Sequence, residues 1–200
     1  MSQAVQSPGE SWVDLALAVE GGPLPEDHSL ELWKALVVAQ QGLSELRGVA
    51  VLPIRGTSQC GAQVLLGRHS RLWMRVPESA VEAILGLCGV CLEVAGAPLK
   101  IGNAKTRALA PYATLYARRV IADTEDEGRF ALWVSERLAA LDVRREFIVG
   151  SRSSVREAGG RLTGFSLMLP ELGARESLRL QAEGLGAGRH LGCGVFLGHK

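Results

Sequence analysis

The sequence has no long hydrophobic run and few aromatic residues, and both absences narrow the class of protein. A helix that spans a bilayer needs about 20 apolar residues, and no apolar segment approaches that length, so we expect no membrane partner. Aromatic residues make up 5% of the chain, which does not favour a site that stacks several ligand rings on aromatic side chains. The polar residues 1–10 lack the basic and apolar regions of a secretory signal, so we expect a cytoplasmic protein.

Cysteine and carboxylate patterns offer no metal site. The four cysteines include the pair Cys88 and Cys91 at C-x-x-C spacing, but a structural zinc site needs a second pair of ligands, which the sequence lacks. No set of carboxylates has metal-ligand spacing either. We therefore expect no metal and no cofactor, and cysteines that are reduced thiols packed as small apolar side chains.

Positive charge is scarce at the start of the chain and concentrated further along. Residues 1–46 hold seven acids and one base, whereas residues 47–75 hold five arginines and no acid, and residues 100–119 five bases and no acid. Arginine forks match phosphate groups better than lysine point charges do. The distribution favours a polyanion bound on one face, and an ordinary solvated surface is the alternative.

Hydrophobic periodicity predicts two successive βαββαβ units. In the first half, we expect strands at 12–19, 49–54, 63–66, 72–76 and 91–94, with helices at 29–40 and 77–87. In the second half, we expect strands at 113–122, 147–150, 162–169 and 195–197, with helices at 127–141 and 172–183. This order predicts an α+β fold of two tandem ferredoxin-like (RRM-like) domains, at 1–99 and 112–200, with a linker at 100–111.

The segment 184–198 contains six glycines between an expected helix and an expected strand. Nucleotide-binding loops of the Rossmann or Walker type follow a strand and open a helix, so this loop is not one of them. Glycine lets a backbone approach a ligand closely, and its N–H groups can form a concavity for anions. We predict phosphate contacts from Gly184, Gly186, Gly188, Arg189, His190, Gly192 and Gly194.

Three C-terminal motifs carry a family resemblance: TGFSL at 163–167, ESLRLQ at 176–181 and GLGAGRHLGCGVF at 184–196. They resemble the C-terminal block of the CRISPR repeat-processing endoribonucleases, the Cas-six family of the RAMP superfamily in its Cmx-six-like variant. Weaker similarity lies at 23–28, 70–77 and 115–120. The resemblance implies tandem ferredoxin-like domains and metal-independent cleavage of CRISPR repeat RNA, a stem-loop, giving mature guide RNAs with a 2′,3′-cyclic phosphate end.

Cleavage of this kind needs a base for the 2′-hydroxyl proton and positive charge for the phosphorane. His28 stands at the expected start of the first helix, close to the family's histidine position, and the helix dipole there favours a neutral imidazole. The alternative is that His28 only fills a helix-start position beside Asp27. His69, between Arg68 and Arg71, is the second candidate, for catalysis or for phosphate contact.

Several other polar residues have both a functional and a purely structural interpretation. Arg152 and Arg156 lie in the polar stretch 151–160, which is either a β-hairpin arm that reaches the RNA stem or an exposed loop. Lys34 could neutralise the transition state, and Tyr112 and Tyr116 could donate a hydroxyl, but a solvated helix face and a half-buried strand also explain them.

Two functions from different classes follow from these residues. The first is a CRISPR-repeat endoribonuclease. The second is a non-cleaving RNA-binding subunit that partners other subunits of a CRISPR ribonucleoprotein. A regulatory domain that binds a small anion is less favoured, because it has no need of arginine-rich segments in both halves.

Overall fold

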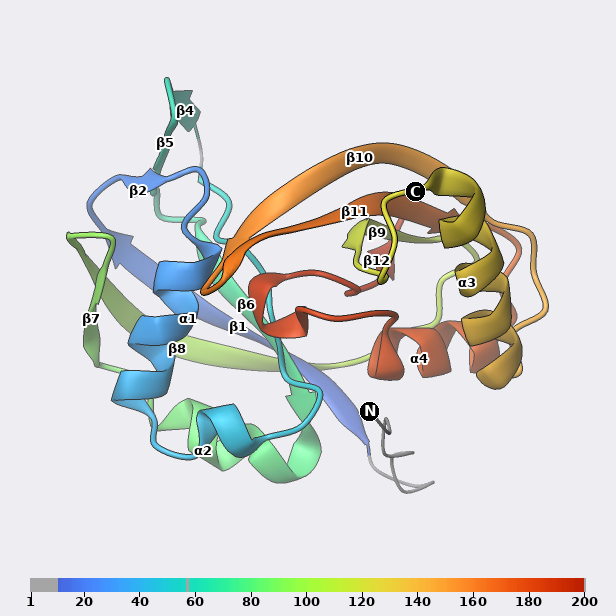
Figure 1. Cartoon of the computed structure of the whole chain (residues 1–200). Helices are drawn as coiled ribbons and strands as arrows, with labels where there is room; N and C mark the ends of the chain where they lie inside the picture. The colour runs from blue at the N-terminus through green and yellow to red at the C-terminus, as the bar shows by residue number, and fades with distance from the viewer. Residues whose placement is uncertain (1–10, 57, 200) are drawn as a thin grey trace.

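The computed structural model describes residues 11–56 and 58–199, which form two α+β units side by side (Figure 1). The elements of the N-terminal unit are β1 (Trp12–Gly21), β2 (Leu24–Pro25), α1 (Ser29–Ala39), the 3-10 turn η1 (Leu43–Glu45), β3 (Ala50–Val51), β4 (Ser58–Cys60), β5 (Gln63–Leu65), β6 (Arg71–Pro77), η2 (Glu78–Ala80), α2 (Val81–Leu85), β7 (Cys91–Val94) and β8 (Ala97–Ala108). Those of the C-terminal unit are β9 (Leu115–Val120), α3 (Glu127–Ala140), β10 (Ile148–Glu157), β11 (Gly160–Leu169), α4 (Ala174–Glu183), η3 (Arg189–Leu191) and β12 (Leu197–Gly198).

The strand orders confirm the predicted tandem ferredoxin-like fold. The N-terminal sheet runs β3-β6-β1-β8-β7, and the C-terminal sheet runs β10-β11-β9-β12. In each unit the first strand lies between the third and the last strand of its βαββαβ order, and its neighbours run antiparallel to it. The short strands β2, β5 and β4 form a separate small sheet.

Alternating burial explains why these segments pair as one-sided strands. In β1, Val13, Leu15 and Leu17 are buried while the intervening residues are partly exposed. On the covered face the helices contribute apolar stripes, such as Phe130, Val134 and Leu138 of α3. Each unit therefore has its own apolar core, and each sheet keeps one face that the helices leave uncovered.

The connection between the units is shorter than the sequence indicated. Residues 100–108 belong to β8, which pairs with β1 along most of its length, so the connection spans only 109–114. The basic residues there suggested a loop, but Lys105 and Arg107 are exposed side chains of a strand held by its main-chain bonds.

Cys91 is exposed, which corrects the expectation of a packed thiol, because it lies on the outer face of edge strand β7.

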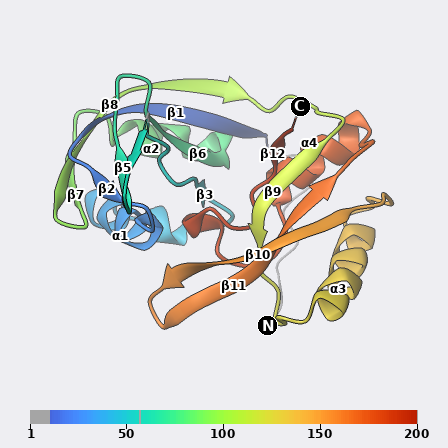
Figure 2. The same ribbon diagram turned by 90° about the horizontal axis from the view of Figure 1, so that it is seen from above.

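A third apolar cluster joins the two units. It combines Leu191 and Cys193 of the glycine-rich segment with Val155 of β10, and Leu30 and Trp33 of α1 pack against it. Seen from above, the β10–β11 hairpin extends from its own unit toward α1 (Figure 2). The glycine-rich segment and this hairpin thus form the structural junction. In the described part of the chain, no helix is long and apolar enough to cross a membrane.

Candidate functional site

A cleft of about 830 Å³ lies between the two units, where the uncovered side of β6 and β8 meets β9 and the end of the chain. Its walls carry six arginines and three aromatic residues. These are Arg55, Arg71, Arg75, Arg107, Arg118, Arg119, Trp73, Tyr112 and Tyr116. Two carboxylates, Asp14 and Glu26, also line the cleft, so its described lining carries an excess of positive charge.

Arg75 anchors the floor of the cleft and is only 2% exposed. Its guanidinium binds the Asp14 carboxylate with two hydrogen bonds, Nε to Oδ1 at 2.7 Å and Nη2 to Oδ2 at 2.9 Å. The remaining nitrogen, Nη1, donates to the backbone carbonyls of Gln181 at 3.0 Å and Phe196 at 2.8 Å. This side chain therefore ties the N-terminal sheet to the C-terminal unit, and its charge is already neutralised.

Other cleft arginines keep charge available for a ligand. Arg55 and Arg118 are exposed, and within the described residues neither makes a side-chain hydrogen bond or ion pair. The Arg107 guanidinium lies 5.6 Å from the centre of the Trp73 ring in a cation–π contact, and it makes no hydrogen bond or ion pair with the residues that the structure describes. Arg119 donates to the Ser153 hydroxyl at 3.0 Å. The unpaired guanidinium groups suit a phosphate backbone.

His28 is buried at the start of α1, 1% exposed. Its Nδ1–H donates to the Pro25 carbonyl at 2.7 Å, and Nε2 accepts the backbone N–H of Ile54 at 3.0 Å. Because Nε2 accepts, the ring is the neutral Nδ1–H tautomer. Burial lowers the pKa of His28, against opposing contributions from the Pro25 carbonyl and Asp27. In this arrangement neither nitrogen is free to accept a proton from a ligand.

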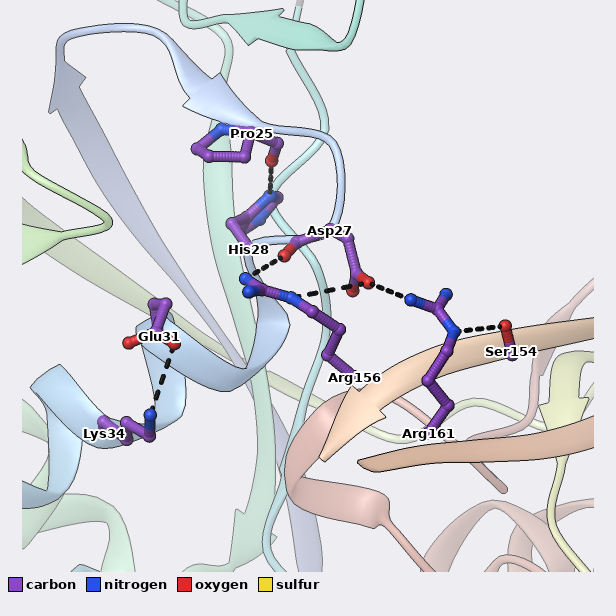
Figure 3. Close-up of polar contacts among 8 residues, drawn as sticks. All are labelled: Pro25, Asp27, His28, Glu31, Lys34, Ser154, Arg156 and Arg161. Atoms are coloured by element: carbon purple, nitrogen blue, oxygen red, sulfur yellow. Dashed lines mark hydrogen bonds and ion pairs between the residues drawn. The ribbon is translucent and has the colours of Figure 1, made fainter. Parts of the chain in front are cut away.

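The β10–β11 hairpin contacts the turn that precedes α1 (Figure 3). Arg156 donates to the Asp27 carbonyl at 3.0 Å, and its Nε lies 3.7 Å from the Asp27 carboxylate. Arg161 Nη1 lies 3.6 Å from the same carboxylate, and its Nε donates to Ser154 at 2.9 Å. The polar stretch is thus a hairpin arm rather than an open loop. A phosphate contact by Arg156 remains a prediction, and to form it Arg156 would have to leave Asp27 and bind the RNA instead.

The glycine-rich segment packs tightly between the units. At Gly186, φ is +80°, and a Cβ there would overlap the carbonyl oxygen of Ile121, the residue that follows β9. At Gly192, φ is +79°, and a Cβ would come within 2.6 Å of Pro53 Cδ in the N-terminal unit. Packing therefore requires both glycines, whatever they contact in a ligand.

Arg189 and His190 form the turn η3 in the middle of this segment. The Arg189 guanidinium lies 5.5 Å from the centre of the Trp12 ring, and none of its nitrogens has a hydrogen-bond partner among the described residues. Burial, with nearby Arg75 adding to it, lowers the pKa of Arg189 to about 10, so it stays charged at neutral pH. The His190 ring lies 5.0 Å from the Trp33 ring.

Some of the remaining predicted residues line the cleft, and others lie outside it. His69 lines it, and its Nε2 accepts from Arg68 Nε at 3.0 Å. Tyr112 and Tyr116 line it as well, whereas Lys34 lies on the exposed face of α1, paired with Glu31 at 3.3 Å. Arg152 pairs with Glu125 in an exposed ion pair.

Several arginines and the tryptophan that line the cleft were not predicted as site residues from the sequence. Arg71, Trp73 and Arg75 alternate along β6, and Arg107 faces Trp73 from β8. Alternation at every second position was a usable signal, since such residues share one face of a strand. Arg161 was missed as well, because its partner Asp27 is remote in sequence.

Comparisons with known proteins agree with this architecture. A family model described as Cas6 Crispr matches residues 13–200. The CRISPR-associated endonuclease Cas6 of Myxococcus xanthus (strain DK1622) is 40% identical over 187 residues, 93% of this chain and 81% of that protein. A solved structure of a Cas6-related gene product from Pyrococcus furiosus has a TM-score of 0.65 at 11% identity, covering 94% of this chain and 98% of the other. Thermus thermophilus Cse3, solved with an RNA representing a pre-cleavage complex, has a TM-score of 0.51 at 14% identity, covering 94% and 98%.

The two ferredoxin-like units share their fold with a solved RAMP protein, at a TM-score of 0.62 and 10% identity, covering 93% of this chain and 98% of the other. The sequence match is more specific than the fold. The chain belongs to the Cas6 family. The resemblance carried by the C-terminal glycine block is thereby confirmed.

Proposed function

We propose that this protein is a metal-independent endoribonuclease that cleaves CRISPR repeat RNA in precursor transcripts. The observation that carries the proposal is the combination of family membership with the arginine-lined cleft between the units. The related Myxococcus xanthus protein is a CRISPR-associated endonuclease. Cleavage at the repeat would give mature guide RNAs that end in a 2′,3′-cyclic phosphate.

The cleft is proposed to hold the RNA backbone. Arg55, Arg107 and Arg118 present guanidinium groups without carboxylate partners among the described residues, so they can each contact a phosphate. Trp73 already carries Arg107 over its ring, and Tyr116 contacts the His199 ring, so base stacking on aromatic side chains contributes little to this proposal. A folded repeat stem, contacted mostly through its phosphates, fits this lining. The predicted contacts of the glycine-rich loop, Arg152 and Arg156 would extend it.

The chemistry needs no metal in this proposal. A neutral imidazole takes the 2′-hydroxyl proton, the 2′-oxygen attacks the adjacent phosphorus, and the bond to the 5′-oxygen breaks as that oxygen takes up a proton from solvent. The surrounding arginines offset the charge of the phosphorane. The two fragments then carry a cyclic phosphate and a free 5′-hydroxyl.

The direct test is to incubate the protein with repeat RNA from its own genome in excess chelator. Cleavage at one position, with a cyclic phosphate detected by mass spectrometry, supports the proposal. The matched control carries a 2′-deoxy nucleotide at the scissile position, which should bind with the same affinity and stay intact. Cleavage that depends on added divalent ions, or cleavage of the deoxy control, contradicts it.

The alternative is a non-cleaving RNA-binding subunit of a CRISPR ribonucleoprotein. One specific observation favours it: both ring nitrogens of His28, the predicted catalytic base, are hydrogen-bonded to backbone groups. Tight binding of the repeat RNA without any cleavage in the same assay would support this alternative.

A further inference from the structure

Two arginines lie directly opposite each other near the tip of the β10–β11 hairpin. Arg156 and Arg161 are cross-strand partners in the register of the two strands, and like charges in such positions repel each other. The Asp27 carboxylate lies against both, 3.7 Å from Arg156 Nε and 3.6 Å from Arg161 Nη1 (Figure 3). One carboxylate of the N-terminal unit thus offsets the charge of two arginines of the C-terminal unit.

The hairpin gives these arginines a firm support. Val155, which precedes Arg156, is 2% exposed in the apolar cluster that joins the units. Leu30 of α1 packs against the same cluster. Arg161 is held within the hairpin, because its Nε donates to the Ser154 hydroxyl at 2.9 Å. The hairpin therefore offers Asp27 a fixed point of attachment beside the start of α1.

Asp27 transmits this attachment to His28, the next residue. Arg156 Nη2 donates at 3.0 Å to the Asp27 carbonyl, which belongs to the peptide bond that joins Asp27 to His28. The His28 ring is tied to the same turn through the Pro25 carbonyl. Its Nε2 accepts the Ile54 N–H, and to act as a base it must exchange that group for the RNA 2′-hydroxyl. The position of the turn therefore decides whether Nε2 reaches the hydroxyl.

The contacts of Asp27 suit the fixing of a position better than the stabilisation of the fold. The three side chains are between 35% and 55% exposed, and exposed ion pairs contribute little to stability. By contrast, a displacement of about 1 Å between reacting groups can lower a rate about 100-fold. Loss of these contacts should therefore change the rate of cleavage more than the melting temperature.

We propose that Asp27 is a positioning residue for cleavage, because its contacts with Arg156 and Arg161 align the turn that carries His28 with RNA bound to the C-terminal unit. The inference rests on the proposed ribonuclease function, with His28 as its base. Asp27 itself neither touches the RNA nor takes up a proton. When Arg156 contacts a phosphate, Arg161 still holds the carboxylate through its own Nη1. The hairpin thus links the unit that carries the base to the unit that carries the glycine-rich loop.

The test measures two quantities for the full chain and its variants. The first is the single-turnover rate of repeat-RNA cleavage at saturating protein, and the second is the affinity for the same RNA with a 2′-deoxy nucleotide at the scissile position. Asp27→Asn and Arg161→Gln should each cleave about 10- to 100-fold more slowly than wild type, with melting temperatures close to it. Asp27→Asn should bind the deoxy RNA at least as tightly as wild type, because it loses a negative charge.

Further variants distinguish a shared contact from a general disturbance of the hairpin. The double variant of Asp27→Asn and Arg161→Gln should be no slower than the slower single variant, because both changes remove one contact. Arg161→Lys keeps the positive charge and should recover part of the rate. Glu125→Gln is the matched control, because Glu125 pairs with Arg152 of the same hairpin and not with the turn before α1. It should cleave at the wild-type rate.

The outcomes separate this inference from the function on which it rests. If the wild-type protein does not cleave its repeat RNA, the proposed function fails and the inference fails with it. If the wild type cleaves and Asp27→Asn cleaves equally fast at saturation, only the inference is overturned. It is also overturned if Asp27→Asn loses affinity but not saturating rate, or if Glu125→Gln is as slow as Asp27→Asn.

Discussion

Arg75 and Asp14 form a two-pronged ion pair between neighbouring strands β6 and β1, at 2.7 Å and 2.9 Å. The same guanidinium continues into the C-terminal unit, where it donates to the carbonyls of Gln181 and Phe196. One side chain thus fixes both the strand pairing of the first unit and the position of the segment that leads into β12. The cleft depends on that relative placement of the units, because residues of both units line it.

Arg75→Gln should therefore destabilise the whole protein. Removing one partner of a buried pair leaves the Asp14 carboxylate and two carbonyls without their donor, and we expect a loss of about 3 kcal/mol in the free energy of unfolding. Urea denaturation followed by far-UV circular dichroism measures it. Arg71→Gln, a half-exposed arginine on the same strand, is the matched control and should cost under about 1 kcal/mol. Equal costs for the two variants would refute the special role of Arg75.

His28 should make stability depend on pH. Its folded pKa lies below the value of about 6.5 in the unfolded chain. The unfolded state therefore binds more protons, and the stability contributed by neutral His28 is present above about pH 6.5 and lost as the pH falls toward the folded pKa. Urea midpoints measured from about pH 7.5 down to about pH 5 should fall less steeply for His28→Gln than for wild type. His190 shifts in the same direction and remains in both proteins, so the difference reports His28 alone.

Gly186→Ala should unfold the loop rather than only weaken RNA binding. The substitution adds a Cβ against the Ile121 carbonyl at a positive φ, and we expect a cost of about 3 kcal/mol or more. Gly42→Ala is the control: its φ is +88° but a Cβ there meets nothing within 4 Å, so only the backbone cost of about 1 kcal/mol applies. Thermal melts compare the two. If Gly186→Ala melts like Gly42→Ala, the loop is looser than its packing indicates.

Arg118→Gln should weaken RNA binding through a lost phosphate contact. We expect the slope of log affinity against log salt to become shallower by about 0.7 to 0.9, with no change in melting temperature. Filter binding at several salt concentrations measures this slope. Arg137→Gln is the matched control, because Arg137 lies on α3, outside the residues that line the cleft. An unchanged slope for Arg118→Gln would place the RNA elsewhere.

Apolar packing should hold the β10–β11 hairpin to the N-terminal unit more strongly than its ion pairs do. Val155 is 2% exposed in the joining cluster, so Val155→Ala should cost about 2 kcal/mol. Asp27→Asn breaks contacts at 3.6 Å and 3.7 Å to half-exposed arginines, and its cost should stay under about 1 kcal/mol. The reverse order of costs, measured by urea denaturation, would show that the ion pairs hold the hairpin.

The sequence by itself determined the fold and the family. Its helices and most strands follow from local periodicity, as in α1 and α3, and the C-terminal motifs sufficed for the family because glycine spacing is a local property. It misplaced the connection between units, since an exposed strand such as the end of β8 has no apolar alternation to distinguish it from a loop.

The tertiary structure alone decided what each polar side chain contacts. The sequence around a histidine that precedes a helix does not indicate whether its ring is hydrogen-bonded. Only the fold brings the Ile54 N–H to His28 Nε2. The same holds for Arg156, which contacts Asp27 across 129 positions of sequence, and for His190, whose ring packs against Trp33 of the other unit. The sequence specifies the chemical type of each side chain, but its hydrogen-bond partners and its burial depend on residues far apart in the chain. These partners are therefore known only from the packed structure of both units.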